Sequence, residues 1–162
     1  MKIGDEFDYR NAKAIIQKTN PKLFKEIYSI LNNPKNKLKL KTKEGTMQRD
    51  VSEQIRKHFM KHKGWKKEQK PEAIPTMRYD LVKDKQFPIE IEVGHTRLVY
   101  ADFFEYLSEY SKEFIKAGIM IVCGDPSKFG HKWHNSIKST KNKIEKIKET
   151  FLVPVWVIGV NP

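Results

Sequence analysis

Residues 78–95, RYDLVKDKQFPIEIEVGH, constrain the fold of this chain more than any other segment. Two stretches of alternating apolar and acidic residues flank a short polar turn, and this pattern predicts a β-hairpin because strand side chains alternate between two faces. One face of the predicted hairpin carries Asp80, Glu90 and Glu92. The opposite face is entirely apolar and consists of Tyr79, Leu81, Ile89, Ile91 and Val93.

The register of the hairpin follows from its turn and its packing. A three-residue turn over 84–86 pairs Lys83 with Phe87, and this pairing puts Asp80 directly opposite Glu90. Opposite residues of an antiparallel pair point the same way, with Cβ atoms roughly 5 Å apart. A shift of one residue would place Asp80 among the isoleucines, so packing selects the first register.

In a chain with a net charge of +12, three carboxylates this close together indicate a specific role. They repel one another and raise one another's pKa, and a divalent cation removes the repulsion. Mg²⁺ prefers oxygen ligands and keeps several waters, so it can activate a water and polarise a phosphoryl oxygen. The alternative is a hairpin with one solvated face, but such faces usually mix basic residues with acidic ones. We therefore predict a Mg²⁺ site on this face.

The charge of the chain favours a partner rich in phosphates. Lys and Arg total 32 against 20 acidic residues in 162, for a net charge of +12 and a pI near 9.6. A Lys-rich solvated surface is the alternative. The one cysteine, Cys123, excludes a disulfide framework; it fits a reduced cytoplasmic setting and a buried strand position. No leader-like or long apolar segment indicates export or a membrane.

The remaining pattern predicts an α/β fold, with a mixed central sheet flanked by helices on both faces. Helix-like periodicity covers 5–31, with Asn20 as the cap of a second piece that starts at Pro21. Further helices are expected over 49–62, 99–116 and 135–150, and further strands over 65–69, 119–123 and 152–160, with a loop over 124–134. Helix 99–116 should bury one face made of Val99, Phe103, Leu107, Tyr110 and Phe114.

This order of elements resembles the core of the PD-(D/E)XK nuclease superfamily, and more narrowly type II restriction endonucleases of the BglII/BamHI branch. The resemblance rests on MQRDVSEQIRKHFMKHKGW (47–65), the hairpin, and EVGHTRLVYADFFEYL (92–107). It spans 47–160, and 1–46 is matched only in being helical. Because the chain shows no internal repeat or linker, we expect a single nuclease domain over 1–162, with a helical N-terminal part (1–46) and a restriction-endonuclease-like core (47–160).

The resemblance also implies roles for individual residues. Asp80 and Glu90 would be Mg²⁺ ligands, joined by the backbone carbonyl of Ile91. Glu92 stands where most members of the superfamily have Lys, but the BamHI type has Glu there and BglII has Gln. Glu92 could accept a proton from the attacking water or hold that water in line. Glu53, on the preceding helix, matches a glutamate that often completes such sites; a solvated helix acid is the alternative.

Two segments are candidate DNA contacts. His95 and Arg97 follow the acidic strand, where the resembled enzymes approach the DNA backbone, although an ordinary capping turn explains them equally well. The loop that follows strand 119–123 could reach a groove or stack on a base, or could simply be exposed; its candidates are Lys128, His131, Lys132 and Trp133. A transition-metal pair of His131 and His134 lacks a third ligand nearby in sequence.

Three functions remain open from the sequence. The first is a Mg²⁺-dependent endonuclease that cuts double-stranded DNA at a specific, palindromic site, acting as a homodimer because two strands need two sites. The second is a structure-specific nuclease such as a Holliday junction resolvase, which favours Lys at the position of Glu92. The third is a non-catalytic DNA-binding protein on the same scaffold, against which the three retained acids argue.

Overall fold

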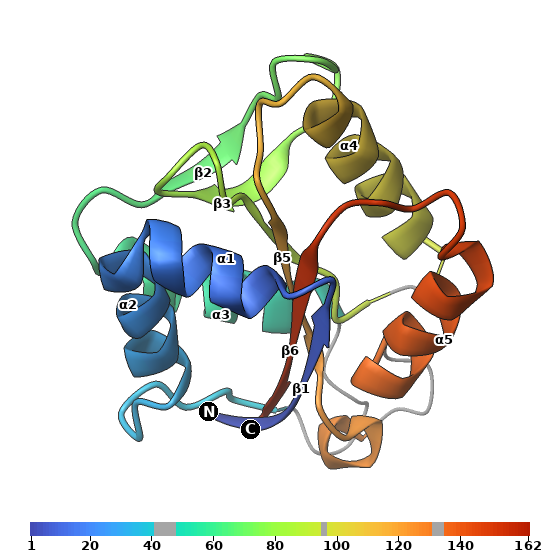
Figure 1. Ribbon diagram of the computed structural model, residues 1–162. Helices are drawn as coiled ribbons and strands as arrows, with labels where there is room; N and C mark the ends of the chain where they lie inside the picture. The colour runs from blue at the N-terminus through green and yellow to red at the C-terminus, as the bar shows by residue number, and fades with distance from the viewer. Residues whose placement is uncertain (41–47, 95–96, 131–134) are drawn as a thin grey trace.

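A computed structural model describes residues 1–40, 48–94, 97–130 and 135–162 (Figure 1). The elements, in chain order, are β1 (Lys2–Tyr9), α1 (Ala12–Thr19), α2 (Pro21–Leu31), α3 (Gln48–Met60), β2 (Lys66–Gln69), β3 (Tyr79–Val82), β4 (Ile89–Ile91), α4 (Val99–Ser111), β5 (Gly118–Cys123), a 3-10 turn (Pro126–Phe129), α5 (Ile137–Ile147) and β6 (Val155–Asn161). No helix in the described ranges is long and apolar enough to cross a bilayer.

The six strands form one mixed sheet in the order β1-β6-β5-β4-β3-β2. The central strands β4, β5 and β6 run parallel to one another, whereas β1 pairs antiparallel with β6 and β3 pairs antiparallel with β4. Both predictions, the mixed sheet and the parallel strand at 119–123, are confirmed. Because β4, β5 and β6 run the same way, the segments that follow them all leave the same edge of the sheet.

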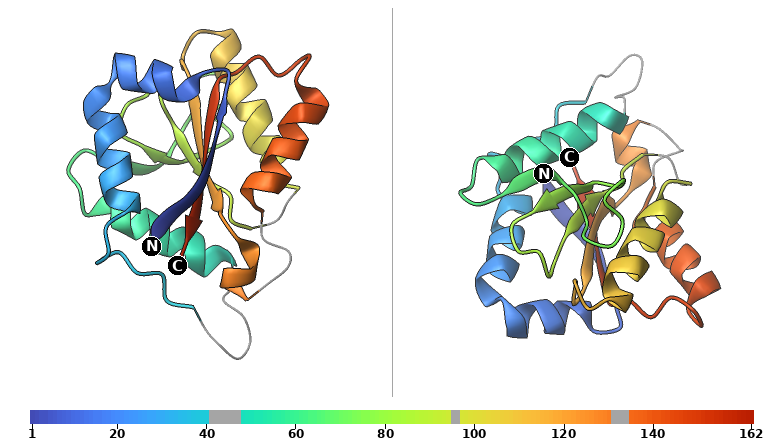
Figure 2. Two further views of the ribbon diagram at one scale, coloured as in Figure 1. Left: turned by 60° about the horizontal axis from the view of Figure 1, so that its bottom comes forward. Right: turned by 90° about the horizontal axis from the view of Figure 1, so that it is seen from above.

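Helices cover both faces of this sheet, as predicted. Helices α1, α2 and α3 lie on one face, and α4 and α5 lie on the other (Figure 2). Side chains of β5 alternate between the two cores, with Ile119 and Ile121 facing α1–α3 and Met120 and Val122 facing α4 and α5. All four are fully buried, and burial of such a side chain stabilises the fold by roughly 1.5–3 kcal/mol.

The N-terminus departs from the predicted helix over 5–31. Residues 5–9 belong to the edge strand β1, which pairs with β6, for example Phe7 with Val157. Arg10 and Asn11 adopt positive φ values of 52° and 60°, which end the strand before α1 begins. The prediction failed because the partner that fixes β1 lies about 150 residues away in sequence. The cap at Asn20 is confirmed, since its side chain accepts the Leu23 N–H at 3.0 Å.

Helix α4 also differs from its predicted form. It ends at Ser111 rather than 116, and Phe114 is 43% exposed. Glu105 and Glu109 take buried positions instead, and the Glu109 carboxylate accepts the backbone N–H groups of Glu72 and Ala73. The buried face of α4 therefore includes two glutamates, one of which accepts backbone hydrogen bonds, and an apolar periodicity alone does not reveal such a face.

Tyr79 leaves the apolar face that the hairpin pattern assigned to it. Its ring packs on the α4 side of the sheet, where it stacks against Tyr106 with ring centroids 6.4 Å apart. The other four residues of that face, Leu81, Ile89, Ile91 and Val93, do pack together against α1–α3. Tyr79 is the first residue of β3, where the strict alternation of side chains between the two faces of the sheet is not yet imposed.

Candidate active site

The hairpin of β3 and β4 brings Asp80 and Glu90 together. Leu81 pairs with Ile89, which places Asp80 opposite Glu90 as the sequence predicts. The Asp80 N–H donates to Glu90 Oε2 at 3.3 Å, and the Ile91 N–H donates to Asp80 Oδ2 at 2.8 Å. Each carboxylate is thus held by a backbone donor of the opposite strand.

Glu90 is a buried carboxylate that is only half satisfied. The residue is only 5% exposed, and its Oε1 has no hydrogen-bond partner within the described part of the chain. Burial, followed by the charges of Asp102, Asp80 and Glu105, raises the pKa of Glu90 well above its ordinary value. A buried anion with a free oxygen is costly unless a cation or a proton compensates it.

Tyr106 of α4 fixes the strand that carries Glu90. Its hydroxyl donates to the Ile119 carbonyl at 2.6 Å and accepts the Glu90 N–H at 3.2 Å, so it joins β4 to β5. The ring passes over Gly118, where a Cβ would lie 2.5 Å from the Tyr106 ring. Glycine at this position is therefore required for the close approach of α4.

Glu92 lies just beyond β4 on the same side as Asp80. Its Oε1 accepts the Gly94 N–H at 3.0 Å. Burial raises the pKa of Glu92 to about 7, the charge of Asp80 adds to this, and the Gly94 hydrogen bond and Lys143 oppose it. A carboxylate with this pKa can both take up and release a proton near neutral pH.

Asn135, which the sequence did not single out, supports the same segment from the start of α5. It is fully buried; its N–H donates to the Gly94 carbonyl at 3.1 Å, and its side-chain amide donates to the Glu92 carbonyl at 3.2 Å. Nothing in its sequence context marks this role, because the partner segment lies about 40 residues away.

Helix α3 approaches the hairpin with three polar side chains. Arg56 Nη1 donates to Asp80 Oδ1 at 3.2 Å, and Arg56 Nε lies 3.4 Å from Glu53 Oε2. The Ser52 hydroxyl donates to the Ile91 carbonyl at 3.4 Å. Glu53, a predicted site residue, thus reaches the site through Arg56, whereas Arg56 and Ser52 were not predicted.

Helix α4 adds two acids that the sequence analysis missed, Asp102 and Glu105. Burial is the main cause that raises the pKa of Asp102 to about 8 and that of Glu105 to about 7; neighbouring carboxylates contribute further. One oxygen of each, Asp102 Oδ2 and Glu105 Oε1, lacks a hydrogen-bond partner in the described ranges. Their spacing of three residues on an amphipathic helix next to the hairpin was the available signal.

This acid set fits a divalent cation chemically. Three buried carboxylate oxygens, on Glu90, Asp102 and Glu105, lack partners among the described residues, in a chain whose net charge is strongly positive. Hard oxygen donors of this kind suit Mg²⁺ and similar ions. As the described side chains stand, however, no three acidic, His or Cys groups converge closely enough to enclose an ion. Asp80 Oδ1 accepts a hydrogen bond from Arg56 in this arrangement.

The predicted DNA contacts are only partly described. Arg97 and Lys128 are exposed, and both follow C-terminal ends of parallel strands, Arg97 after β4 and Lys128 after β5. His95 and the loop residues His131, Lys132 and Trp133 lie outside the described residues. The two described cations thus leave the sheet at the edge where Glu92 lies.

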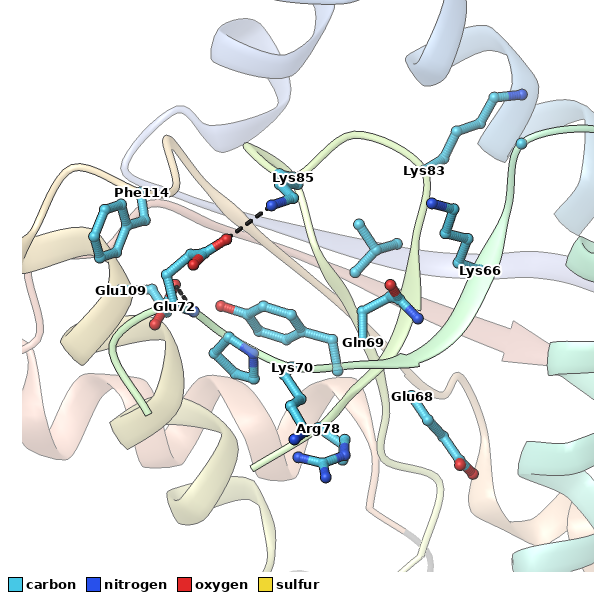
Figure 3. A pocket seen from close by; sticks show the side chains of 14 residues that line it. Lys66, Glu68, Gln69, Lys70, Glu72, Arg78, Lys83, Lys85, Glu109 and Phe114 are labelled. Carbon is cyan, nitrogen blue, oxygen red and sulfur yellow. Dashed lines mark hydrogen bonds and ion pairs between the residues drawn. The ribbon is translucent and has the colours of Figure 1, made fainter. Parts of the chain in front are cut away.

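A separate basic pocket of about 610 Å³ lies beside β2 and β3 (Figure 3). Its lining includes five cations, Lys66, Lys70, Arg78, Lys83 and Lys85. Two of these are neutralised, because Lys83 pairs with Glu26 at 2.6 Å and Lys85 pairs with Glu72 at 2.8 Å. Glu68 also lines the pocket, and its carboxylate lies 4.0 Å from Arg56, so the pocket adjoins the acid site.

A mixed sheet between helical layers carries paired acids on a central hairpin, with another acid at the end of the second strand, and this arrangement is the one expected of a PD-(D/E)XK nuclease. The chain belongs to the BglII/BglIII restriction endonuclease family, whose family model matches residues 5–160. It is accordingly a type II restriction endonuclease, a site-specific endodeoxyribonuclease, and the family implies a divalent metal cation. The match includes most of the N-terminal third, beyond the 47–160 of the sequence resemblance.

Among solved structures, the chain is similar to restriction endonuclease BglII complexed with a DNA 16-mer. The TM-score is 0.75 at 18% identity, and the match covers 100% of this chain and 79% of that chain. At this identity the likeness establishes the fold. No curated protein sequence matches the chain.

Proposed function

We propose that this restriction endonuclease uses Mg²⁺, held by the Asp80 and Glu90 carboxylates and the backbone carbonyl of Ile91. The observation that carries the proposal is the Asp80–Glu90 pair, fixed across the hairpin and left with an unpaired, buried Glu90 oxygen. Holding these anions together destabilises the fold, and a bound cation would offset that destabilisation. Asp102 and Glu105 add negative charge behind the pair.

When bound, Mg²⁺ supplies positive charge to the scissile phosphate and lowers the pKa of a coordinated water. The protein contributes the rest. Glu92, with a pKa of about 7, accepts the proton of the attacking water or holds that water in line with the phosphodiester bond. Glu53 approaches Asp80 from α3 and completes the acid set. Hydrolysis leaves a 5′-phosphate and a 3′-hydroxyl.

The DNA is bound largely through its phosphates. A net charge of +12 supplies the sequence-independent attraction, and Arg97 and Lys128 are exposed at the edge of the sheet where Glu92 lies. On the sequence pattern alone, we also propose His95 and the loop residues His131, Lys132 and Trp133 as DNA contacts.

We further propose a homodimer that cuts a palindromic site, because one chain supplies one acid site and double-strand cleavage needs two. An exposed apolar surface on and beside α4 supports this, since Leu98, Tyr100 and Phe104 are 53%, 46% and 59% exposed. A cytoplasmic location suits an enzyme whose single cysteine is buried and free.

The test is incubation of the protein with mixed plasmid DNA, in Mg²⁺ and in EDTA, followed by sequencing of the ends. Discrete bands in Mg²⁺ alone, with one palindrome flanking every cut, are expected. Cutting confined to four-way junctions would favour the structure-specific alternative. Salt-sensitive binding without any cutting would favour the non-catalytic one.

A further inference from the structure

Asp80 lies in the middle of a row of acids that crosses three strands. On one side the β3–β4 register places it opposite Glu90. On the other, the pairs Lys67–Leu81 and Gln69–Tyr79 flank it, which places Glu68 of β2 opposite Asp80. Like charges directly opposite each other destabilise a sheet. The metal-free row therefore needs a compensating positive charge.

Arg56 of α3 provides that charge in the present structure. Its guanidinium lies 3.2 Å from Asp80, 3.4 Å from Glu53 and 4.0 Å from Glu68, so one cation serves three carboxylates. The Arg56 side chain is only 17% exposed. Screening by solvent is consequently weak, and the contact with Asp80 is a charge-assisted hydrogen bond, which is stronger than a neutral one.

The atoms that α3 engages coincide with the proposed metal ligands. Arg56 occupies Asp80 Oδ1, while the other oxygen of Asp80 accepts the Ile91 N–H. The Ile91 carbonyl, the third proposed ligand, accepts the Ser52 hydroxyl. A divalent cation at Asp80 Oδ1 would lie close to the Arg56 guanidinium that donates to the same oxygen, and the two positive charges would repel each other.

We propose that Arg56 stands in for the metal in the metal-free enzyme, and that a divalent cation must displace its guanidinium from Asp80 to bind. This inference rests on the proposed function, since it assumes that Asp80 is a metal ligand. Arg56 is then a positioning residue. It offsets the repulsion among the acids when no metal is bound, and it lowers the apparent affinity of the site for the ion.

The test is direct binding of Mn²⁺ to the full chain without DNA, with free Mn²⁺ measured by electron paramagnetic resonance. Arg56→Gln is expected to tighten Mn²⁺ binding roughly tenfold, because it removes a competing charge-assisted hydrogen bond. The same variant should melt at a lower temperature in EDTA and regain more of that loss than the wild type when Mn²⁺ is added. Arg56→Lys keeps the charge with fewer donors and should fall between the two.

Lys57→Gln is the matched control, because it removes the same charge from the next, exposed position of α3, where no contact with Asp80 exists in the described structure. Its Mn²⁺ affinity should change less than about threefold. An equal gain in Lys57→Gln would overturn the proposal by reducing the effect to net charge. Unchanged or weaker Mn²⁺ binding by Arg56→Gln would also overturn it. If Arg56→Gln does not fold, Arg56→Lys decides in the same way.

Asp80→Asn separates this inference from the proposed function. It should weaken Mn²⁺ binding and abolish the gain that Arg56→Gln gives, since the two residues act through one contact. If Asp80→Asn weakens binding but Arg56→Gln brings no gain, the displacement idea alone fails. If Asp80→Asn leaves binding unchanged, the proposed metal site fails and the inference with it.

Discussion

The raised pKa of Glu105 shows how much the buried acids lower the free energy of unfolding when they are charged. The residue is 1% exposed, and burial, then the charges of Glu109 and Asp80, raises its pKa from 4.5 to about 7. Because the folded pKa exceeds the unfolded one, this group contributes stability below pH 4.5 that is lost as pH rises through 7. At about 1.4 kcal/mol per pKa unit, the loss above pH 7 is roughly 3 kcal/mol.

Glu105→Gln removes the charge with little change of shape. In EDTA the variant should gain roughly 3 kcal/mol in the free energy of unfolding at pH 8, relative to wild type, but under about 1 kcal/mol at pH 5. Urea denaturation at both pH values measures this, and any penalty from the new amide affects both alike. Glu149→Gln, at an exposed position, should show neither gain. An effect of the same size at both pH values would refute the electrostatic reasoning.

Three further results are expected. Gly118→Ala should lower the free energy of unfolding, measured by urea denaturation, by roughly 1–3 kcal/mol, because its Cβ would lie 2.5 Å from the Tyr106 ring. Urea curves identical to those of wild type would contradict the packing described. Tyr106→Phe should lose roughly 1–2 kcal/mol in the same assay, since two backbone groups at β4 and β5 lose their partner, and an unchanged midpoint would count against that bridge. DNA affinity in Ca²⁺ should fall roughly a hundredfold or more between 50 and 200 mM salt, and a flat salt dependence measured by fluorescence anisotropy would exclude phosphate-dominated binding.

The hairpin could be predicted from sequence because its determinants are local. Its period-two pattern and its turn lie within 18 residues, and together they place Asp80 opposite Glu90. The apolar strand at 119–123 was equally plain, since a continuous buried run indicates a parallel central strand. Tyr79 left its predicted face because it begins its strand, where alternation is least enforced.

The rest of the site depends on how helices rotate against the hairpin. Arg56 on α3 and Asp102 and Glu105 on α4 reach the acids only because each helix presents one particular face, and tertiary packing sets that rotation. Local periodicity also misassigned residues 5–9, because an edge strand with three acids resembles a helical surface until its partner β6 is known. Long-range pairing, rather than propensity, determined both outcomes.

The most direct test of the central claim compares cleavage with binding in Asp80→Asn. With Mg²⁺ and DNA that carries the cleaved site, the cleavage rate should fall by about a thousandfold, since a metal ligand supplies several kcal/mol of transition-state stabilisation. Affinity for the same DNA in EDTA should change by less than about threefold, because Asp80 contributes no positive charge to phosphate binding. Full cleavage by Asp80→Asn would contradict the proposed active site.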